Sequence, residues 1–182
     1  MSYETWQSLP QMFFEQAALH ADRPHLRAKR DGNWHTCDYR TVAAETARLA
    51  SGLIAIGVAP GERVALVSEN RPEWTIADLA IMEAGGITVP AFTTNTVADH
   101  AHIIGNSGAI GAIVSSRQMA ERVAAAALDT GRLRFLVSIE DAGIGQKSSF
   151  ELLTWQAAMA RGREADPAVT ERVSALKRGD IA

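Results

Sequence analysis

The chain has 182 residues, of which 47% are apolar and 21% charged, and this length and composition suit one globular domain with a substantial core. The formal net charge is −3, and no predicted helix carries a stripe of Lys and Arg, which excludes a basic nucleic-acid-binding protein. No apolar run reaches the roughly 20 residues that span a bilayer. The first residues also lack the basic and apolar regions of a secretory signal.

Cys37 is the single cysteine, so no disulfide can form within the chain. We interpret Cys37 as a small buried apolar side chain, because free cysteine is among the most buried residue types. A chain without disulfides is typical of a reducing compartment, and the sequence therefore predicts a cytoplasmic protein.

Residues 1–60 are predicted to form a helix, a hairpin and a long helix. The first helix covers 9–21, where apolar residues share one face, and it ends before Pro24. The long helix begins after Asp38, a good N-cap residue, and its apolar stripe continues to Ile56.

The hairpin lies between these two helices. The dipeptide Asp31-Gly32 is a strong turn signal, and it separates two short strands at 26–29 and 34–36. We expect this hairpin to be a small element apart from the main sheet.

Residues 61–182 alternate between strand and helix patterns. Apolar runs rich in β-branched residues predict four strands, at 64–67, 87–90, 110–114 and 135–139. Because each gap between strands has room for a helix, the pattern predicts an α/β fold with a mostly parallel sheet and helices on both faces. The order of the strands in the sheet cannot be read from the sequence.

The segment 62–90 has the clearest strand–helix–strand pattern. Asn70 is predicted to cap its helix, with the Glu73 side chain reaching back to the cap and Pro72 in the first turn. The pair Gly85-Gly86 allows the left-handed exit. Residues at helical spacing form the face expected on the sheet: Trp74, Ala77, Ile81 and Ala84.

Four further helices are predicted. Thr96 caps the first, which stops at 106–108, and the second covers the Ala-rich stretch 117–127. Ser149 is expected to cap a helix that runs through Met159. A weak helix from Ala168 to Leu176 precedes a turn at 177–180.

The segment 141–149 resembles a phosphate-binding loop only superficially. A Walker loop needs Gly immediately before its Lys-Ser pair and a second Gly five residues upstream, where this chain has Gln146 and Asp141. The Asp141 carboxylate would repel a phosphate, so we interpret the segment as a solvated glycine-rich turn.

Two other patterns lack the spacing that dinucleotide binding or metal binding requires. Gly105, Gly108 and Gly111 lack dinucleotide-binding spacing, and Gly111 lies within a predicted strand. His100 and His102, which follow Asp99, are two residues apart on a helix and so point to different sides, which argues against a shared metal ion. The scattered residues His20, His25 and His35 are explained by surface or hairpin positions.

Residues 69–73 follow the first predicted strand of the sheet, at the end where open α/β sheets bind ligands. Helix capping already accounts for Asn70, Pro72 and Glu73. Arg71 alone has no evident structural role. We assign no catalytic, cofactor-binding or metal-binding residue.

Two runs carry a family resemblance: Ser-Glu-Asn-Arg-Pro-Glu-Trp at 68–74, and Ile-Met-Glu-Ala-Gly-Gly-Ile-Thr-Val-Pro at 81–90. They resemble motifs in the N-terminal part of the acyl-adenylate-forming (AMP-dependent) synthetases and ligases, closest to the long-chain fatty acyl-CoA synthetase branch. An upstream pair at 38–42 and 48–53 is similar to the preceding motif, with Asp38 where Thr or Ser is usual and Thr41 where Glu is usual. The resemblance extends from about Phe13 to Ala182.

The resemblance implies an enzyme that activates a carboxylic acid with ATP and Mg²⁺ and passes the acyl group from AMP to coenzyme A. The family's phosphate loop, ribose-binding Asp and C-terminal lid Lys have no counterparts here, and the pattern at 177–182 resembles the segment just before that loop. We therefore expect residues 1–182 to be the N-terminal part of a longer ligase that is inactive alone and binds no cofactor.

Further expectations follow from that reading. The partners would be the remainder of the adenylate-forming domain, its C-terminal lid and a carboxylic acid, with no nucleic acid. An incompletely covered sheet edge or face is expected near Ile181. A homodimer and a peripheral membrane contact remain open. So does the alternative that the chain is a stand-alone, non-catalytic α/β binding or interaction module, and the acid itself is not specified.

Overall fold

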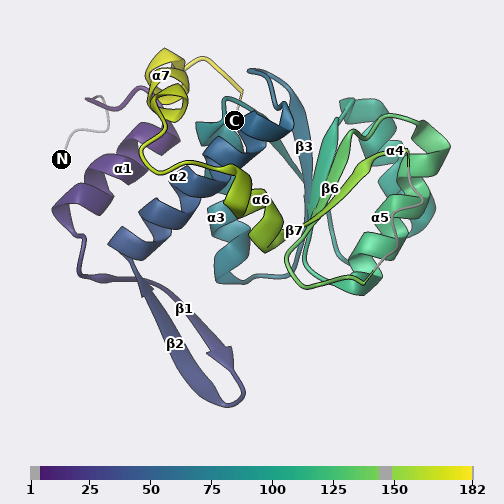
Figure 1. Cartoon of the computed structure of the whole chain (residues 1–182), viewed down its shortest axis with the longest axis horizontal. Coiled ribbons are helices and arrows are strands. Elements are labelled where there is room, and N and C mark those ends of the chain that lie inside the picture. The colour runs from purple at the N-terminus through teal and green to yellow at the C-terminus, as the bar shows by residue number, and fades with distance from the viewer. Residues whose placement is uncertain (1–4, 144–148, 182) are drawn as a thin grey trace.

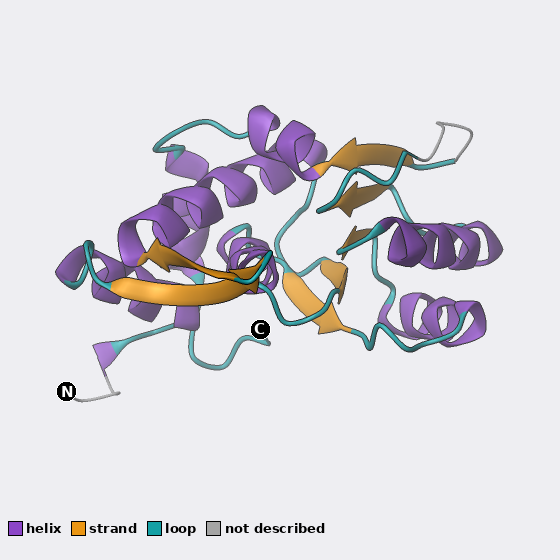
Figure 2. Cartoon of the chain, turned by 90° about the horizontal axis from the view of Figure 1, so that it is seen from below, coloured by secondary structure: helices purple, strands orange, loops and turns teal. Residues whose placement is uncertain are grey.

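The computed structural model describes residues 5–143 and 149–181, in which a parallel five-stranded sheet lies between two layers of helices (Figures 1 and 2). A two-stranded hairpin projects from one layer. The helices are α1 Leu9–Leu19, α2 Tyr39–Ile56, α3 Pro72–Glu83, α4 Val97–Ser107, α5 Arg117–Thr130, α6 Trp155–Arg161 and α7 Pro167–Ala175. The strands are β1 Pro24–Arg30, β2 Asn33–Asp38, β3 Arg63–Val67, β4 Ile87–Pro90, β5 Gly111–Val114, β6 Phe135–Ser138 and β7 Glu151–Thr154.

The main sheet has the strand order β4-β3-β5-β6-β7, and every neighbouring pair is parallel. The predicted α/β class, parallel sheet and separate hairpin are therefore confirmed. The connection after β3 leads to the edge strand β4. The connection after β4 crosses over β3 and leads to β5 on its other side. Because both crossovers are right-handed by rule, α3 and α4 lie on opposite faces of the sheet, as Figure 1 shows.

The two faces of the sheet belong to two separate cores. Along β3, Val64 and Leu66 join a large cluster with residues of α2, α3 and α6. Ala65 and Val67 join a smaller cluster with residues of α4 and α5, in which many members are alanine. All four residues are buried, as is expected of a parallel strand covered on both sides.

The hairpin and the long helix form as predicted. Asp31 and Gly32 both have positive φ, 50° and 80°, which is the signature of a type I′ turn. The Asp38 carboxylate accepts the Thr41 backbone N–H at 2.7 Å and caps α2. Cys37, expected to be buried, is instead half-buried at the base of the hairpin, and burial raises the pKa of its thiol.

The predicted helix over 149–159 is wrong in its first half. Residues 151–154 form β7, which pairs parallel with β6, and α6 begins only at Trp155. The Thr154 hydroxyl, rather than Ser149, caps that helix by accepting the Ala157 backbone N–H at 3.1 Å. Pairing with the exposed edge of β6 outweighs the local helical pattern, which is a tertiary effect.

Other helix ends differ by a few residues. The first helix ends at Leu19, two residues earlier than predicted, and α5 continues to Thr130 before Gly131 adopts φ 62°. Thr96 and Asp99 form a reciprocal capping box at the start of α4, which confirms the predicted Thr96 cap.

Helices α2 and α6 cross at an unusually close approach that depends on two glycines. A Cβ atom on Gly52 would lie 2.2 Å from the Ala158 carbonyl oxygen. A Cβ on Gly162, just after α6, would lie 2.0 Å from the Arg48 carbonyl oxygen. Backbone therefore meets backbone on both sides of this crossing, and a side chain there would push the helices apart.

The sheet is incompletely covered at β4, where an open edge was expected. Strand β4 is an edge strand whose residues are only partly buried, whereas β3, β5 and β6 are almost entirely buried. Ile181, with 77% of its surface exposed, lines a groove beside Gly85 and Ile87 at the amino end of β4. No helix within the described ranges is long and apolar enough to cross a membrane.

Candidate functional site

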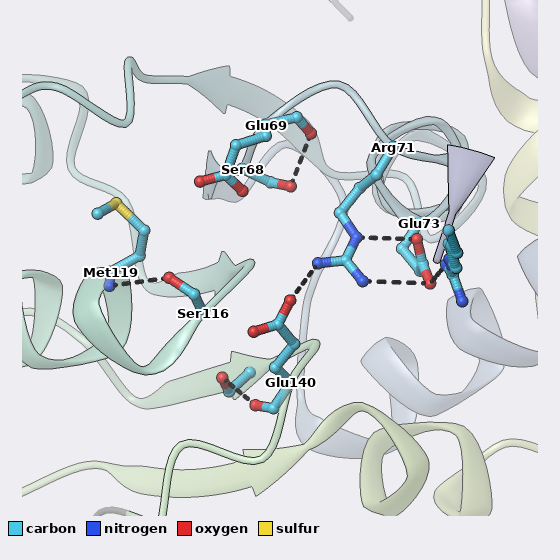
Figure 3. Close-up of polar contacts among 9 residues, drawn as sticks. Ser68, Glu69, Arg71, Glu73, Ser116, Met119 and Glu140 are labelled. Atoms are coloured by element: carbon cyan, nitrogen blue, oxygen red, sulfur yellow. Dashed lines mark hydrogen bonds and ion pairs between the residues drawn. The ribbon is translucent and has the colours of Figure 1, made fainter. Parts of the chain in front are cut away.

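The carboxyl ends of β3 and β5 meet where the chain connections diverge to opposite faces of the sheet. Open parallel sheets generally bind ligands in the crevice at this point. The residues that follow the strands are Ser68–Arg71 after β3, Ser115-Ser116 after β5, and Glu140 after β6. Together they form the candidate site (Figure 3).

Arg71 lies at the centre of this site, between two carboxylates from distant parts of the chain (Figure 3). Its Nε donates to Glu73 Oε2 at 2.9 Å and its Nη1 donates to Glu140 Oε1 at 2.8 Å. The second contact passes over the end of β5, because β5 separates β3 from β6 in the sheet. Arg71 therefore has the structural role that the sequence did not reveal.

Glu73 extends the network to the hairpin. Its Oε1 accepts Arg30 Nη2 at 2.5 Å, so the end of β1 is tied to the first turn of α3. Partial burial would raise the pKa of Glu73, but hydrogen bonds from Arg71 and Arg30 outweigh burial and hold that pKa below its usual value. Arg30 was missed in the sequence because its partner is 43 residues away.

Glu69 faces the crevice from the end of β3. The hydroxyl of Ser115, which follows β5, lowers the pKa of the Glu69 carboxyl more than burial raises it. The Ser68 hydroxyl donates to the Glu69 carbonyl oxygen at 2.9 Å. The crevice therefore presents a carboxylate beside hydroxyl groups.

The predicted cap at Asn70 is wrong. The N-cap residue of α3 is Arg71, and no side chain caps the helix there. Glu73 cannot reach back as a capping arm because Arg71 and Arg30 hold its carboxylate. Pro72 does occupy the first turn as predicted, Gly85 exits with φ 77°, and Trp74 packs against the larger core.

The patterns that we excluded as ligand sites have structural roles where they are described. Gly111 lies in β5, and a Cβ on it would come within 2.1 Å of the Phe135 ring. Asp99 belongs to the α4 capping box, and His100 is buried whereas His102 is exposed, so the two rings lie on different sides. Of the segment 141–149, residues 144–148 lie outside the described residues.

Replacing Arg71 with methionine is expected to lower the free energy of unfolding by about 1–2 kcal/mol, because the partly buried Glu73 and the exposed Glu140 both lose a charged donor. Chemical denaturation of both proteins measures the difference. The matched control is Arg117→Met, which removes an exposed Arg117–Glu121 pair on α5 and should change stability by less than about 0.5 kcal/mol. Equal losses for the two variants would contradict a structural role for the Arg71 network.

Comparison with known proteins identifies the family. The model of the AMP-binding enzyme family matches residues 13–175. The chain belongs to the AMP-binding enzyme family. This match includes α1 to α7 almost in full, together with the candidate site, and it confirms the resemblance seen in the motif runs.

Among curated relatives of this chain is the long-chain-fatty-acid–CoA ligase FadD15 of Mycobacterium tuberculosis. It is 31% identical over 172 residues, which cover 94% of this chain and 27% of that protein. Feruloyl-CoA synthase of an Amycolatopsis species is 37% identical over 110 residues, which cover 60% of this chain and 22% of that protein.

A solved structure shows the same fold. The A domain of carboxylic acid reductase from Segniliparus rugosus, in complex with AMP and a co-purified carboxylic acid, matches with a TM-score of 0.73 at 18% identity. The match covers 91% of this chain and 32% of that one. The chain thus spans about a fifth to a third of the length of these relatives.

Proposed function

We propose that residues 1–182 are the N-terminal part of the adenylate-forming domain of an ATP-dependent carboxylic acid–CoA ligase. Residues 1–60 would supply the first helices and the hairpin, and residues 61–182 the βα sheet. The observation that carries this proposal is the family match over 13–175 together with a long-chain acyl-CoA ligase relative that aligns over 94% of the chain.

In this proposal, the described residues do not supply the site for a nucleoside triphosphate. Glu69 and Glu140 line the groove at the carboxyl end of the sheet, with Glu73 beside them, and these carboxylates would repel phosphate oxygens. Arg71, the cation between them, already donates to two of the three. We therefore derive no step of adenylate chemistry from this chain and assign ATP, Mg²⁺ and coenzyme A to the rest of the proposed protein.

In this proposal the chain acts as a scaffold. The Arg71 network fixes the loops after β3 and β6 relative to one another, so that the crevice keeps one shape. The remainder of the domain would cover β4, which is the incompletely buried edge beside Ile181. The acid would be a long-chain fatty acid, by likeness to the relative, and the compartment the cytoplasm.

The 182-residue chain alone is expected to show no carboxylate-dependent exchange of pyrophosphate into ATP, because residues 1–182 lack counterparts of the family's phosphate loop, ribose-binding Asp and lid Lys. The assay is run with palmitate and with ferulate. In parallel, we expect the coding region after Ala182 to continue in frame into a Ser/Thr/Gly-rich loop with Lys, and the protein that it encodes to catalyse the exchange.

The assay on the short chain tests the scaffold role, and the test of the full coding region tests the ligase proposal. Exchange by the short chain above the rate without enzyme would contradict the scaffold role. A full coding region that encodes no such loop, or whose product gives no exchange with any tested acid, would contradict the ligase proposal and favour a non-catalytic interaction module.

A further inference from the structure

The outer edge of β1 has backbone groups that the hairpin leaves unpaired. The type I′ turn at Asp31-Gly32 makes Arg30 and Asn33 a hydrogen-bonded pair, since such a turn joins its first carbonyl to its fourth N–H. Pairs in an antiparallel ladder alternate between bonded and non-bonded. The register then turns the backbone N–H and C=O of Arg27 and Lys29 away from β2.

This edge borders a groove of about 800 Å³. One wall is the consecutive run 26–31 together with Trp34 of β2, and the other is the loop 69–72 with Thr75 and Glu140. Because side chains alternate between the two faces of a strand, a consecutive run of lining residues indicates that the groove follows the edge of β1. In the described part of the chain, no backbone hydrogen bond beyond the β1–β2 ladder involves residues 26–30.

The side chains along this edge define what would pair with it. Arg27 and Lys29 lie on one face of the hairpin, both exposed, and neither forms an ion pair with a described residue. The other face carries Leu26 and Ala28, and Leu26 packs against the larger core. An added strand would therefore place acidic residues opposite the two cations and small apolar residues between them.

Three carboxylates also line the groove: Asp31, Glu69 and Glu140. Glu140 is held by Arg71, whereas the Glu69 carboxyl is ionised at neutral pH because the pKa of this group is lowered. These charges disfavour acidic residues on the apolar face of an added strand. The two cations on one face of the hairpin and the carboxylates in the groove therefore both favour a segment in which acidic and apolar residues alternate.

We propose that the outer edge of β1 is a docking site for an extended segment of a partner protein in which acidic residues alternate with small apolar ones. The segment would add a third strand to the hairpin, which projects from the helical layer in Figures 1 and 2. A second copy of this chain is a poor occupant, because two β1 edges would bring the cations Arg27 and Lys29 together.

The probe is the peptide acetyl-Thr-Val-Glu-Val-Glu-Val-Thr-amide, titrated into the ¹⁵N-labelled 182-residue chain. We expect binding at low-millimolar concentration, with shifts of the amide signals of Arg27 and Lys29 and slowed hydrogen exchange at those two amides. Methylation of the backbone nitrogens of both glutamates keeps the charges but removes the donors, and it is expected to abolish binding. Replacing both glutamates with lysine should also abolish it.

The protein variant Arg27→Gln with Lys29→Gln is expected to weaken peptide binding about tenfold, which corresponds to two cross-strand charge pairs. The matched control is Arg117→Gln with Arg132→Gln, which removes two exposed cations from another part of the surface and should leave binding unchanged. All of these side chains are exposed, so the variants should remain folded.

Four outcomes would overturn the proposal. They are equal binding of the N-methylated peptide, equal weakening by the control variant, amide shifts confined to residues outside 25–31, and no binding at any soluble peptide concentration. A concentration-dependent dimer that protects the same two amides would instead assign the edge to a second copy. Each result leaves the proposed ligase function unaffected, because none of them depends on adenylate chemistry.

Discussion

Replacing Gly52 with alanine is expected to lower the free energy of unfolding by about 3 kcal/mol, although alanine is the better helix former. The new Cβ would lie 2.2 Å from the Ala158 carbonyl oxygen, and that oxygen belongs to the backbone of α6. The clash can be relieved only by moving α6 away from α2, which would open the larger core around Trp155. Urea denaturation followed by circular dichroism measures the loss.

The matched control is Gly105→Ala. Gly105 also lies within a helix, α4, but a Cβ there meets nothing within 4 Å. Alanine should therefore stabilise the protein at this position, by about 0.5–1 kcal/mol. Two glycine-to-alanine changes in helices thus have opposite predicted signs. A Gly52→Ala protein as stable as the parent would show that the helices do not approach so closely.

Replacing Glu83 with glutamine is expected to make the protein more stable at pH 8 and to have little effect below pH 5. Glu83 is completely buried at the end of α3, and neither carboxylate oxygen has a hydrogen-bond partner among the described residues. Burial raises the pKa of Glu83 well above its ordinary value of 4.5, so the folded protein holds it in the neutral form.

The sign of the pH dependence follows from proton binding. Above pH 4.5 the unfolded chain releases the Glu83 proton while the folded chain retains it, so the folded state binds more protons and stability falls as pH rises. Each unit of pKa elevation corresponds to about 1.4 kcal/mol of stability lost by the time the pH exceeds the folded pKa. Glutamine removes this slope because it has no proton to release.

The measurement is the free energy of unfolding of both proteins at several pH values between 5 and 8. Glu45 and Asp78, whose pKa values burial also raises, contribute slopes of the same sign in both proteins, so the difference isolates Glu83. The exposed Glu171→Gln variant is the control. Parallel stability curves for parent and Glu83→Gln would disprove the buried neutral carboxyl.

Sequence patterns predicted the fold wherever local signals and tertiary packing agree. The strands from 64 to 138 have clear apolar runs. The Asp31-Gly32 turn and the Asp38 cap are marked by residue types that favour a turn and a helix start. Strand β7 was missed because its four residues resemble the first turn of the helix that follows, and only the open edge of β6 makes them a strand.

The candidate site was predicted less well than the fold. Its location was predictable, because ligand crevices occur at the carboxyl ends of parallel strands. Its contacts were not, because Arg71 meets Glu140 across 69 residues of sequence and Glu73 meets Arg30 across 43. The same contacts explain why Asn70 does not cap α3, since Glu73 serves the ion network instead of the helix end.

The two cores on either side of the sheet differ in how much apolar surface they can bury. The layer of α4 and α5 contributes many alanines, such as Ala120, Ala126 and Ala127, whereas the layer of α2 and α3 contributes Leu49, Leu53 and Ile76. Since a small side chain removes less apolar area from water, the alanine layer is held by the smaller free energy. That layer would be the first to separate from the sheet in partial unfolding, while the leucine-rich side keeps its native packing.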